Sequence, residues 1–303
     1  MYNINRIKER RAQMERLGII APSRMHDYYS EGGRFSSGEM IEFLSGAGFE
    51  GIDVSLDSLT RLDGSDKAVL YNLKKKAADK KLSLCATHLP FYMPAPDSEE
   101  FNSKYIPEVK AGIDATAYLG VRLAVIHPVA YYESRKTLEE WIIKNVEFLS
   151  PLVEYANARG VKLLIENMAG HRERYDHLYG SKASEIYLLA KILGCGNCWD
   201  TGHANITGLN QGEEILTLAD TLELLHAHDN DGIHDDHRVP RDKDCTVNWC
   251  NIVAALKNIE YIGAIEMEIR TGNLSREINY RRDLCKLAYR RGEQIRENIL
   301  SRK

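Results

Sequence analysis

The residues best suited to chemistry lie between positions 226 and 237, where His226, His228, His234 and His237 are interspersed with aspartates. This stretch directly follows the apolar run 222–225, so imidazoles and carboxylates begin where a strand is expected to end. Imidazole and carboxylate groups are the side chains that hold zinc and other divalent metals in proteins. The stretch therefore predicts a metal site at the C-terminal end of a strand. The alternative interpretation is a solvated acidic loop with incidental histidines.

Side chains of the same kind end the other apolar runs of the chain. His88 and His127 each end a run of apolar residues, and Glu166 and Asp200 do the same further along. If these runs are parallel strands of a barrel, their ends gather at one rim, where the active sites of such barrels lie. A single histidine at a strand end is commonly satisfied by its neighbours, but the recurrence over consecutive runs indicates one shared site.

The last apolar run carries two glutamates on one face. Ile265 and Met267 have one parity, whereas Glu266 and Glu268 have the other, because side chains alternate along a strand. A buried carboxylate without a partner is costly, so this face needs a cation. Glu268 is the expected metal ligand, and Glu266 is either a substitute ligand or a group behind the ligands. The alternative is that one of them pairs with Arg270 or Lys162.

A repeating pattern of short apolar strands and amphipathic helices must position these residues. No linker interrupts the pattern, and we expect one domain over residues 1–303. Repeated strand–helix units imply parallel strands, and eight units favour a closed (β/α)8 TIM barrel with an extra N-terminal helix over an open doubly wound sheet. The expected strands are 18–22, 49–56, 82–89, 121–127, 161–167, 197–200, 222–228 and 263–269.

Helices are expected before the first strand and after each strand. A helix beginning at Thr137 has Glu140 in capping-box spacing, and Pro151 is expected to kink or split it. The closing helix carries an apolar stripe that either packs on the barrel, which we favour, or serves a dimer. The remaining helices are expected at 4–17, 36–47, 65–81, within 98–119, and at 184–193, 213–219, 247–258 and 274–299.

Composition fits this architecture and excludes several classes of protein. The chain has 303 residues, 44% hydrophobic and 28% charged, which suits a soluble barrel of at least about 250 residues. It has no apolar run long enough to cross a membrane and no secretion signal, so we expect a cytoplasmic protein with reduced cysteines. Motifs for dinucleotides, phosphate loops and nucleophile elbows are absent. A net charge of −4 argues against binding nucleic acid through overall charge.

The ordered set of strand-end residues resembles the xylose isomerase-like barrel superfamily. This superfamily includes sugar and sugar-phosphate isomerases and epimerases, and also the endonuclease IV family of AP endonucleases. The resemblance implies a metal-dependent barrel enzyme, but it does not decide between these reactions. It rests on His88, His127-Pro128, Glu166-Asn167, Asp200-Thr201-Gly202-His203, His228-Asp229-Asn230-Asp231, Asp235-Asp236-His237 and Glu268.

Each branch implies its own use of these residues. The epimerase branch implies one divalent ion (Zn, Mn, Co or Mg) held by Glu166, Asp200, His228 and Glu268. The two glutamates would move a proton next to a metal-polarised carbonyl, and His203 would bind a substrate oxygen. A polyol dehydratase is a close variant. The endonuclease branch implies three zinc ions, which use the same five residues together with His88, His127, Asp235 and His237.

Departures from the endonuclease pattern favour the sugar enzyme. Phe91 stands where that family has tyrosine, Val129 stands where it has glycine, and the loop after His228 is shorter. Arginines at the expected rim are interspersed with acidic residues, which suits a small substrate better than a DNA duplex. We therefore expect a sugar or sugar-phosphate substrate and a monomer or homodimer, with nucleic acid the weaker candidate and a ligand-binding barrel without turnover the weakest. The candidate substrate-binding residues are Arg172, Arg174, Arg238 and Arg270.

Overall fold

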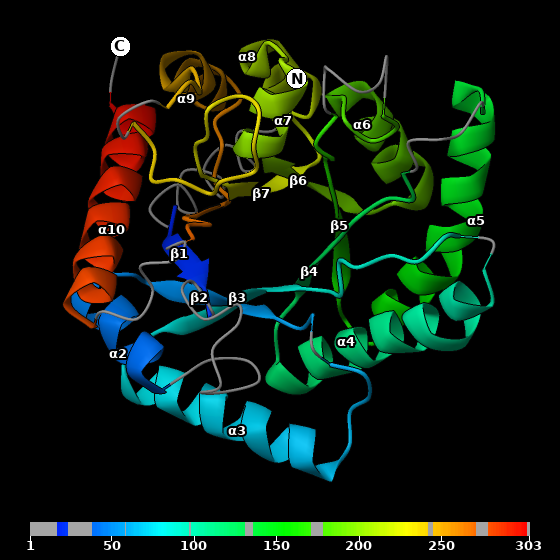
Figure 1. Cartoon of the computed structure of the whole chain (residues 1–303), viewed down its shortest axis with the longest axis horizontal. Helices are drawn as coiled ribbons and strands as arrows, with labels where there is room; N and C mark the ends of the chain where they lie inside the picture. Colours follow the sequence, from blue (N-terminus) through cyan, green and yellow to red (C-terminus); the bar gives the residue numbers. More distant parts are fainter. Residues whose placement is uncertain are drawn as a thin grey trace, which may run out of the picture.

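The structure, a computed structural model, is a closed barrel of parallel strands in the order β1 to β8 (Figure 1). Each strand pairs with the next one in sequence, and β1 pairs with β8 to close the barrel. The expected (β/α)8 TIM barrel is therefore confirmed, whereas residues 4–16 of the expected helix at 4–17 lie outside the described residues. The structure describes residues 17–23, 38–57, 59–96, 98–130, 136–170, 178–241, 245–270 and 278–301.

The strands are short, and several end before the sequence predicts. The strand expected to reach position 228 ends at His226, and the one expected to reach 269 ends at Glu266. In both cases the last residue of the strand is polar. The strands are β1 (Ile19–Pro22), β2 (Gly51–Ser55), β3 (Ser83–His88), β4 (Leu123–Ile126), β5 (Lys162–Glu166), β6 (Gly196–Asp200), β7 (Leu222–His226) and β8 (Ala264–Glu266).

The helices form a ring around the strands (Figure 1). Helix α5 begins as predicted, with Thr137 accepting from the backbone N–H of Glu140 in a capping box. It is not split at Pro151, because buried side chains on both sides of the proline pack the helix onto the barrel. The described helices are α2 (Gly38–Ala47), α3 (Gly64–Asp79), a short π-helix η1 (Phe101–Tyr105), α4 (Ile106–Leu119), α5 (Leu138–Asn157), α6 (Ala183–Leu193), α7 (Thr201–Thr207), α8 (Gln211–Thr217), α9 (Trp249–Asn258) and α10 (Ile278–Leu300).

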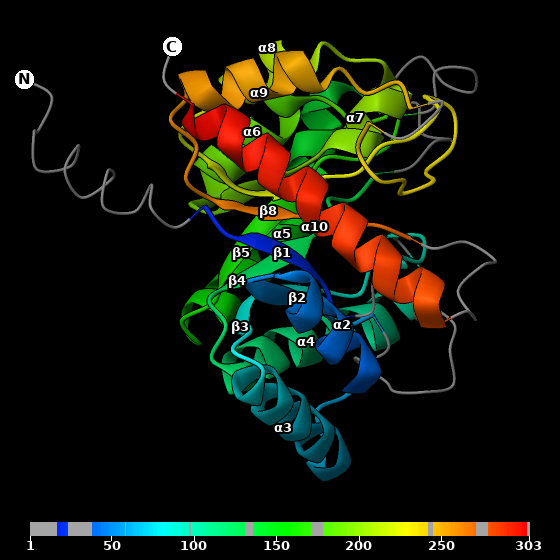
Figure 2. The same cartoon turned by 90° about the vertical axis from the view of Figure 1, so that its left-hand side faces the viewer.

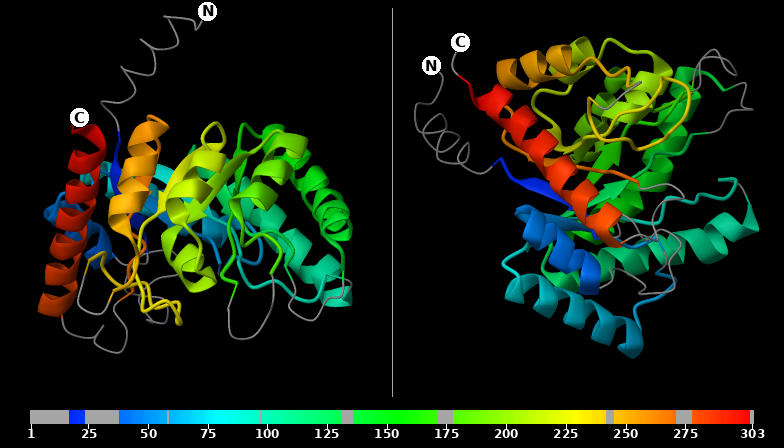
Figure 3. Two further views of the ribbon diagram at one scale, coloured as in Figure 1. Left: turned by 90° about the horizontal axis from the view of Figure 1, so that it is seen from above. Right: turned by 60° about the vertical axis from the view of Figure 1, so that its left-hand side comes forward.

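The closing helix α10 packs on the barrel wall. Figure 2 shows it crossing the side of the barrel over β1 and β8. Its buried residues include Cys285, Ala288 and Ile295, and at Gly292 an added Cβ would lie 2.7 Å from Ile19. Figure 3 shows the C-terminal end of α10 on one side of the barrel and the yellow loop after β7 on the opposite side. The apolar stripe is thus used for packing within the chain.

The barrel interior contains an apolar layer below a polar one. Because the side chains of a strand alternate, the residue two positions beyond each interior apolar residue points inward again, nearer the rim. In β5, for example, Leu164 belongs to the apolar layer and Glu166 follows it at the rim. The apolar layer consists of Ile20, Ala86, Val125, Leu164, Cys198 and Leu224.

Candidate metal centre

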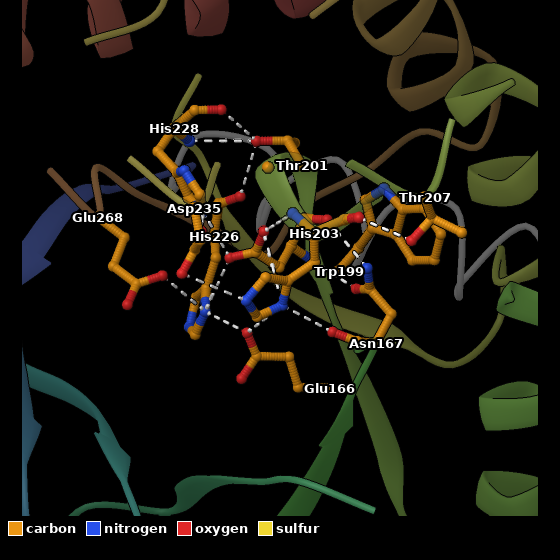
Figure 4. A network of polar contacts seen from close by, with 12 residues as sticks. Glu166, Asn167, Trp199, Thr201, His203, Thr207, His226, His228, Asp235 and Glu268 are labelled. Atoms are coloured by element: carbon orange, nitrogen blue, oxygen red, sulfur yellow. Dashed lines mark hydrogen bonds and ion pairs between the residues drawn. The ribbon is translucent and has the colours of Figure 1, made fainter. Parts of the chain in front are cut away.

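Four side chains at the rim form a central ligand group: Glu166, Asp200, His226 and Glu268. Each offers one ligand atom, and these atoms all lie within 4.8 Å of one another. Nδ1 of His226 is 3.1 Å from Glu166 Oε1, 3.3 Å from Glu268 Oε2 and 3.9 Å from Asp200 Oδ2. Figure 4 shows Glu166, His226 and Glu268 pointing toward one another from separate elements.

Strand alternation places three of these ligands in one layer. Glu166, Asp200 and His226 each follow an interior apolar residue by two positions and end β5, β6 and β7. Glu268 reaches the same place differently, because it lies beyond the end of β8. A turn in which the N–H of Glu268 donates to the carbonyl of Glu266 (3.0 Å) directs its carboxylate back to His226.

Glu166 also belongs to a second ligand group, with His88 and His127. Its Oε2 is 3.2 Å from Nε2 of His88 and 3.1 Å from Nε2 of His127, while its Oε1 faces His226. One carboxylate oxygen is therefore directed to each group. This is the arrangement of a bridging carboxylate.

A third ligand group lies nearer the loops and contains His228, Asp235 and His237. Nε2 of His237 is 3.0 Å from Asp235 Oδ2, and Nε2 of His228 is 4.0 Å from Asp235 Oδ1. The rings of His228 and His237 are stacked with their centroids 4.0 Å apart. Nε2 of His203 is 3.9 Å from Asp235 Oδ2, which places His203 beside this group.

Backbone carbonyls fix the orientation of three of these histidine rings. In each ring Nδ1–H donates to a carbonyl, which leaves the Nε2 lone pair directed at a ligand group. This is the usual arrangement in metal-binding histidines, because it holds the ring and its tautomer in place. The pairs are His88 with Leu89, His203 with Asn167, and His237 with Glu268, each at 2.8 Å.

The donor set fits a divalent cation. Glu166 and Asp200 are at most 1% exposed, and burying carboxylates so completely is unfavourable unless a positive charge compensates them. Among the described residues, the buried Oδ1 of Asp235 has no hydrogen-bond partner. Mixed imidazole and carboxylate donors suit zinc and other first-row divalent metals. We conclude that the residues present can hold such an ion.

The buried acids and imidazoles of the site shift one another's pKa values. Burial alone raises the pKa of Glu166, but His226 and His127 outweigh it and hold that pKa well below its usual range. Burial opposes protonation of His88, yet the adjacent Glu166 raises its pKa to about 9. For His203 burial is likewise outweighed, chiefly by Asp200 and Asp235, and its pKa is raised to about 9. His88 and His203 are thus protonated at neutral pH and balance part of the negative charge of the surrounding carboxylates.

Two histidines at the end of β7 and directly after it lie beside the central group. His226 has its Nδ1 nearest Glu166 and Glu268, whereas His228, the ligand that the sequence analysis predicts, has its Nε2 nearest Asp200, and its role as a metal ligand stays a prediction. His226 ends β7 and is paired in register with Asp200 of β6 and Glu266 of β8, so it lies in the ligand layer. His228 lies two residues further along, in the third group, where its Nε2 is 2.9 Å from Asp200 Oδ2.

The candidate substrate-binding arginines are only partly described. Arg172 and Arg174 lie outside the described residues. Arg238 lies 2.5 Å from Asp236 Oδ2 and 3.6 Å from Asp231 Oδ2, and Arg270 lies 3.8 Å from Asp235 Oδ2. Both described arginines are therefore near carboxylates, which offset part of the charge they would present to a phosphate.

The sequence analysis also missed a buried acid of the same interior. Asp53 on β2 is 1% exposed, and its Oδ2 has no hydrogen-bond partner among the described residues. Burial raises its pKa to about 6, against the opposing effects of His88 and His226. The sequence feature that could have revealed Asp53 is a charged residue within the apolar strand Gly51–Ser55. A charged side chain in a buried strand has to face the interior or a partner.

Gly202 is required by the packing of His228. A Cβ on Gly202 would lie 1.9 Å from Cε1 of His228, whose ring is stacked on His237 on another side. We expect G202A to reduce the free energy of unfolding by about 1–3 kcal/mol, as overpacking typically does. Urea unfolding measures this. As a control, G46A in α2, where an added Cβ meets nothing within 4 Å, should not destabilise the protein. Equal stability of G202A and G46A would contradict this account.

Comparison with known proteins identifies the family. Residues 41–291 match the family model described as the xylose isomerase-like TIM barrel. The chain belongs to this family. One relative is D-psicose 3-epimerase of Agrobacterium fabrum, 26% identical over 262 residues that make up 82% of this chain and 85% of that protein. Another is an uncharacterised protein of Methanocaldococcus jannaschii, 29% identical over 203 residues, which are 63% of this chain and 67% of that protein.

A solved structure within this fold supports the architecture. The IolI protein, crystallised with a zinc atom, aligns with a TM-score of 0.72 at 16% identity and covers 94% of this chain and 100% of its own. At this identity the likeness shows the fold alone.

None of the helices in the described ranges has the length and apolarity needed to span a membrane.

Proposed function

We propose that this barrel is a divalent-metal-dependent epimerase or isomerase of a small sugar or sugar phosphate. The observation that carries the proposal is the central group, in which Glu166 and Glu268 face a common centre together with Asp200 and His226. The relationship to D-psicose 3-epimerase supports a reaction of this class. The IolI protein, which shares this fold, was solved with a zinc atom, and this supports the proposed metal requirement.

The proposed chemistry uses two carboxylates on opposite sides of one substrate. When bound by Glu166, Asp200, His226 and Glu268, the ion would bind substrate oxygens and polarise the carbonyl. One glutamate then removes the proton from the carbon beside that carbonyl, and the other returns a proton from the opposite side, which inverts the carbon. His203 orients a substrate hydroxyl through its Nε2 when that nitrogen is not used by a metal. Burial of Glu166 and Asp200 keeps water from competing.

Assays on purified protein test this function directly. The metal-free protein is reloaded with Mn²⁺, Co²⁺, Zn²⁺ or Mg²⁺ and incubated in D₂O with ketopentoses, ketohexoses and their phosphates. We expect at least one of these substrates to be converted to its epimer or aldose isomer, with deuterium incorporated beside the carbonyl and no conversion after chelation. Absence of conversion and of deuterium exchange with every metal and every sugar would contradict the proposal.

Metal binding is expected to release protons and to strengthen as pH rises. The pKa of His226 is raised well above its usual value, because Cys198 and the surrounding glutamates outweigh the effect of burial. The pKa of His88 is raised to about 9. These rings are therefore protonated at pH 7, and a metal must displace their protons before it can bind. Affinity should rise as pH increases from 6 to 9. Titration calorimetry in two buffers of different ionisation enthalpy should show at least one proton released, and equal heats in both buffers would contradict this expectation.

The two flanking groups favour a second candidate, a zinc phosphodiesterase of the AP-endonuclease type. His88 with His127, and Asp235 with His237, extend the central group on both sides through shared or adjacent ligands. Such an enzyme should bind three zinc ions and cut DNA at abasic sites. Cleavage of an abasic duplex together with inactivity on every sugar would favour this candidate. About one bound ion and activity on a sugar would favour the epimerase.

A further inference from the structure

Two residues of the site lie beyond the regular backbone pairing of the sheet. The last register pair between β5 and β6 joins Glu166 to Cys198, two residues before Asp200. The last pair between β6 and β7 joins Asp200 to His226, two residues before His228. The backbone groups of Asp200 and His228 that face the preceding strand therefore need other partners, because buried N–H and C=O groups have to be paired.

Asn167 supplies these partners for Asp200. Its side-chain Oδ1 accepts from the backbone N–H of Asp200 (2.6 Å), and its Nδ2 donates to the carbonyl of the same residue (3.0 Å). One amide thus takes the place that a further residue of β5 would occupy. The backbone carbonyl of Asn167 also accepts from Nδ1–H of His203 (2.8 Å). Asn167 is 0% exposed, so its side chain cannot touch a substrate.

Thr201 supplies the partners for His228. Its hydroxyl accepts from the backbone N–H of His228 (3.1 Å) and donates to the carbonyl of that residue (2.7 Å), as Figure 4 shows. Thr201 is also 0% exposed, and it directly follows Asp200 as the first residue of α7. Two side-chain clamps, Asn167 on Asp200 and Thr201 on His228, therefore join the ends of β5, β6 and β7.

The clamps bear on the direction of two side chains that offer ligand atoms. Asp200 and His228 are both 0% exposed, and Oδ2 of Asp200 is 2.9 Å from Nε2 of His228. Zinc ligand atoms lie about 2.0–2.2 Å from the ion, and a shift of about 1 Å in the backbone that carries a ligand spoils such a site. Fixing the backbone at these two residues thus fixes the ligand atoms.

We propose that Asn167 and Thr201 are positioning residues, which hold Asp200 and His228 in place for the metal before it binds. Each acts through the backbone of the residue that it clamps, and neither contacts the ion or the substrate. The inference rests on the proposed metal centre. It is the same whether His228 serves the central ion or the third ligand group, and it does not depend on which substrate is converted.

Zinc affinity of threonine variants tests the clamp on His228. In competition with a chelator, T201V should bind zinc about 10–100-fold more weakly than wild type, the loss typical for removing a partner that supports a ligand. T201S keeps the hydroxyl and should bind nearly as wild type does. The control is T116V in α4, which removes another fully buried hydroxyl, bonded to that of Thr87 (2.7 Å). T116V should lose stability as T201V does, yet keep the wild-type zinc affinity.

A pair of asparagine variants tests the clamp on Asp200. N167A should also weaken zinc binding by about 10–100-fold. Its control is N197A, near the other end of β6, where the buried amide donates to the carbonyls of Ile165 (3.2 Å) and Ile186 (3.1 Å). N197A should be less stable than wild type and keep the wild-type zinc affinity. Wild-type affinity in both T201V and N167A, or an equal loss in the two controls, would overturn the positioning role and leave the metal centre intact.

Amide hydrogen exchange in the metal-free wild type gives a measurement that needs no variant. The backbone N–H groups of Asp200 and His228 should exchange as slowly as those within β6 and β7, because the clamps are formed without the ion. Rapid exchange of both amides would overturn the proposal even if the variants do not fold. A wild-type protein that binds no zinc but protects both amides would overturn the metal centre, and with it the role that the clamps have in metal binding.

Discussion

E268Q is expected to lower kcat for the sugar reaction by about 10²–10⁴-fold, the range typical for loss of a general base or acid. The amide can still offer an oxygen to the metal, but it cannot take up or return a proton. Histidines around the centre, His237 first among them, outweigh burial and hold the pKa of Glu268 well below its usual range, so wild type presents an ionised carboxylate. Initial rates of epimer formation at saturating metal measure the effect.

A glutamate at the other end of the barrel provides the matched control. Glu223 on β7 pairs with Lys162 at the start of β5, away from the rim. E223Q removes the same charge from the same barrel and should retain nearly the wild-type kcat. If E268Q lost its metal and yet still converted the sugar at the wild-type rate, both the ligand and the proton-transfer roles of Glu268 would be wrong.

H226A is expected to weaken binding of the central ion by at least about 100-fold, more than loss of a supporting partner usually does. His226 contributes the imidazole of the central group, and its Nδ1 is within 3.3 Å of both Glu166 and Glu268. H228A should leave this ion bound much more tightly than H226A does, because His228 belongs to the third group with Asp235 and His237. Chelator competition with zinc or cobalt measures both variants.

The pair of histidine variants also tests which of the two histidines, His226 at the end of β7 or His228 after it, holds the central ion. Both substitutions remove a buried imidazole two residues apart, so each serves as a control for the other. An equal loss of the central ion in the two variants, or a larger loss in H228A, would return His228 to the place that the sequence first suggested.

The barrel could be predicted from the sequence because each strand is an apolar run of similar length between helical segments. Thr137 with Glu140 marked the start of α5 correctly, since a capping box depends on local spacing alone. Helix α7 could not be predicted in this way. It is short, contains Gly202, and begins directly after the strand-end residue Asp200, whose side chain accepts from the N–H of His203 (2.6 Å). Helix propensity is weak in such a segment.

The residue types of the site and the strand ends that carry them could be predicted from the sequence. Glu166 and Asp200 follow from strand alternation, and the same rule applied to Leu224 adds His226 to the predicted His228. For β8 the sequence analysis selected Glu268 over Glu266, and the structure brings Glu268 to the centre. The turn after the strand that directs its carboxylate there could not be predicted, because it depends on the tertiary path of the loop.

The central claim is that Glu166, Asp200, His226 and Glu268 hold one divalent ion. A crystal structure of the protein loaded with zinc, with diffraction data recorded at the zinc absorption edge, tests it most directly. We predict an anomalous peak within about 2.0–2.3 Å of one atom from each of these four side chains. An anomalous map in which zinc lies elsewhere, or in which these side chains have no peak between them, would contradict the account.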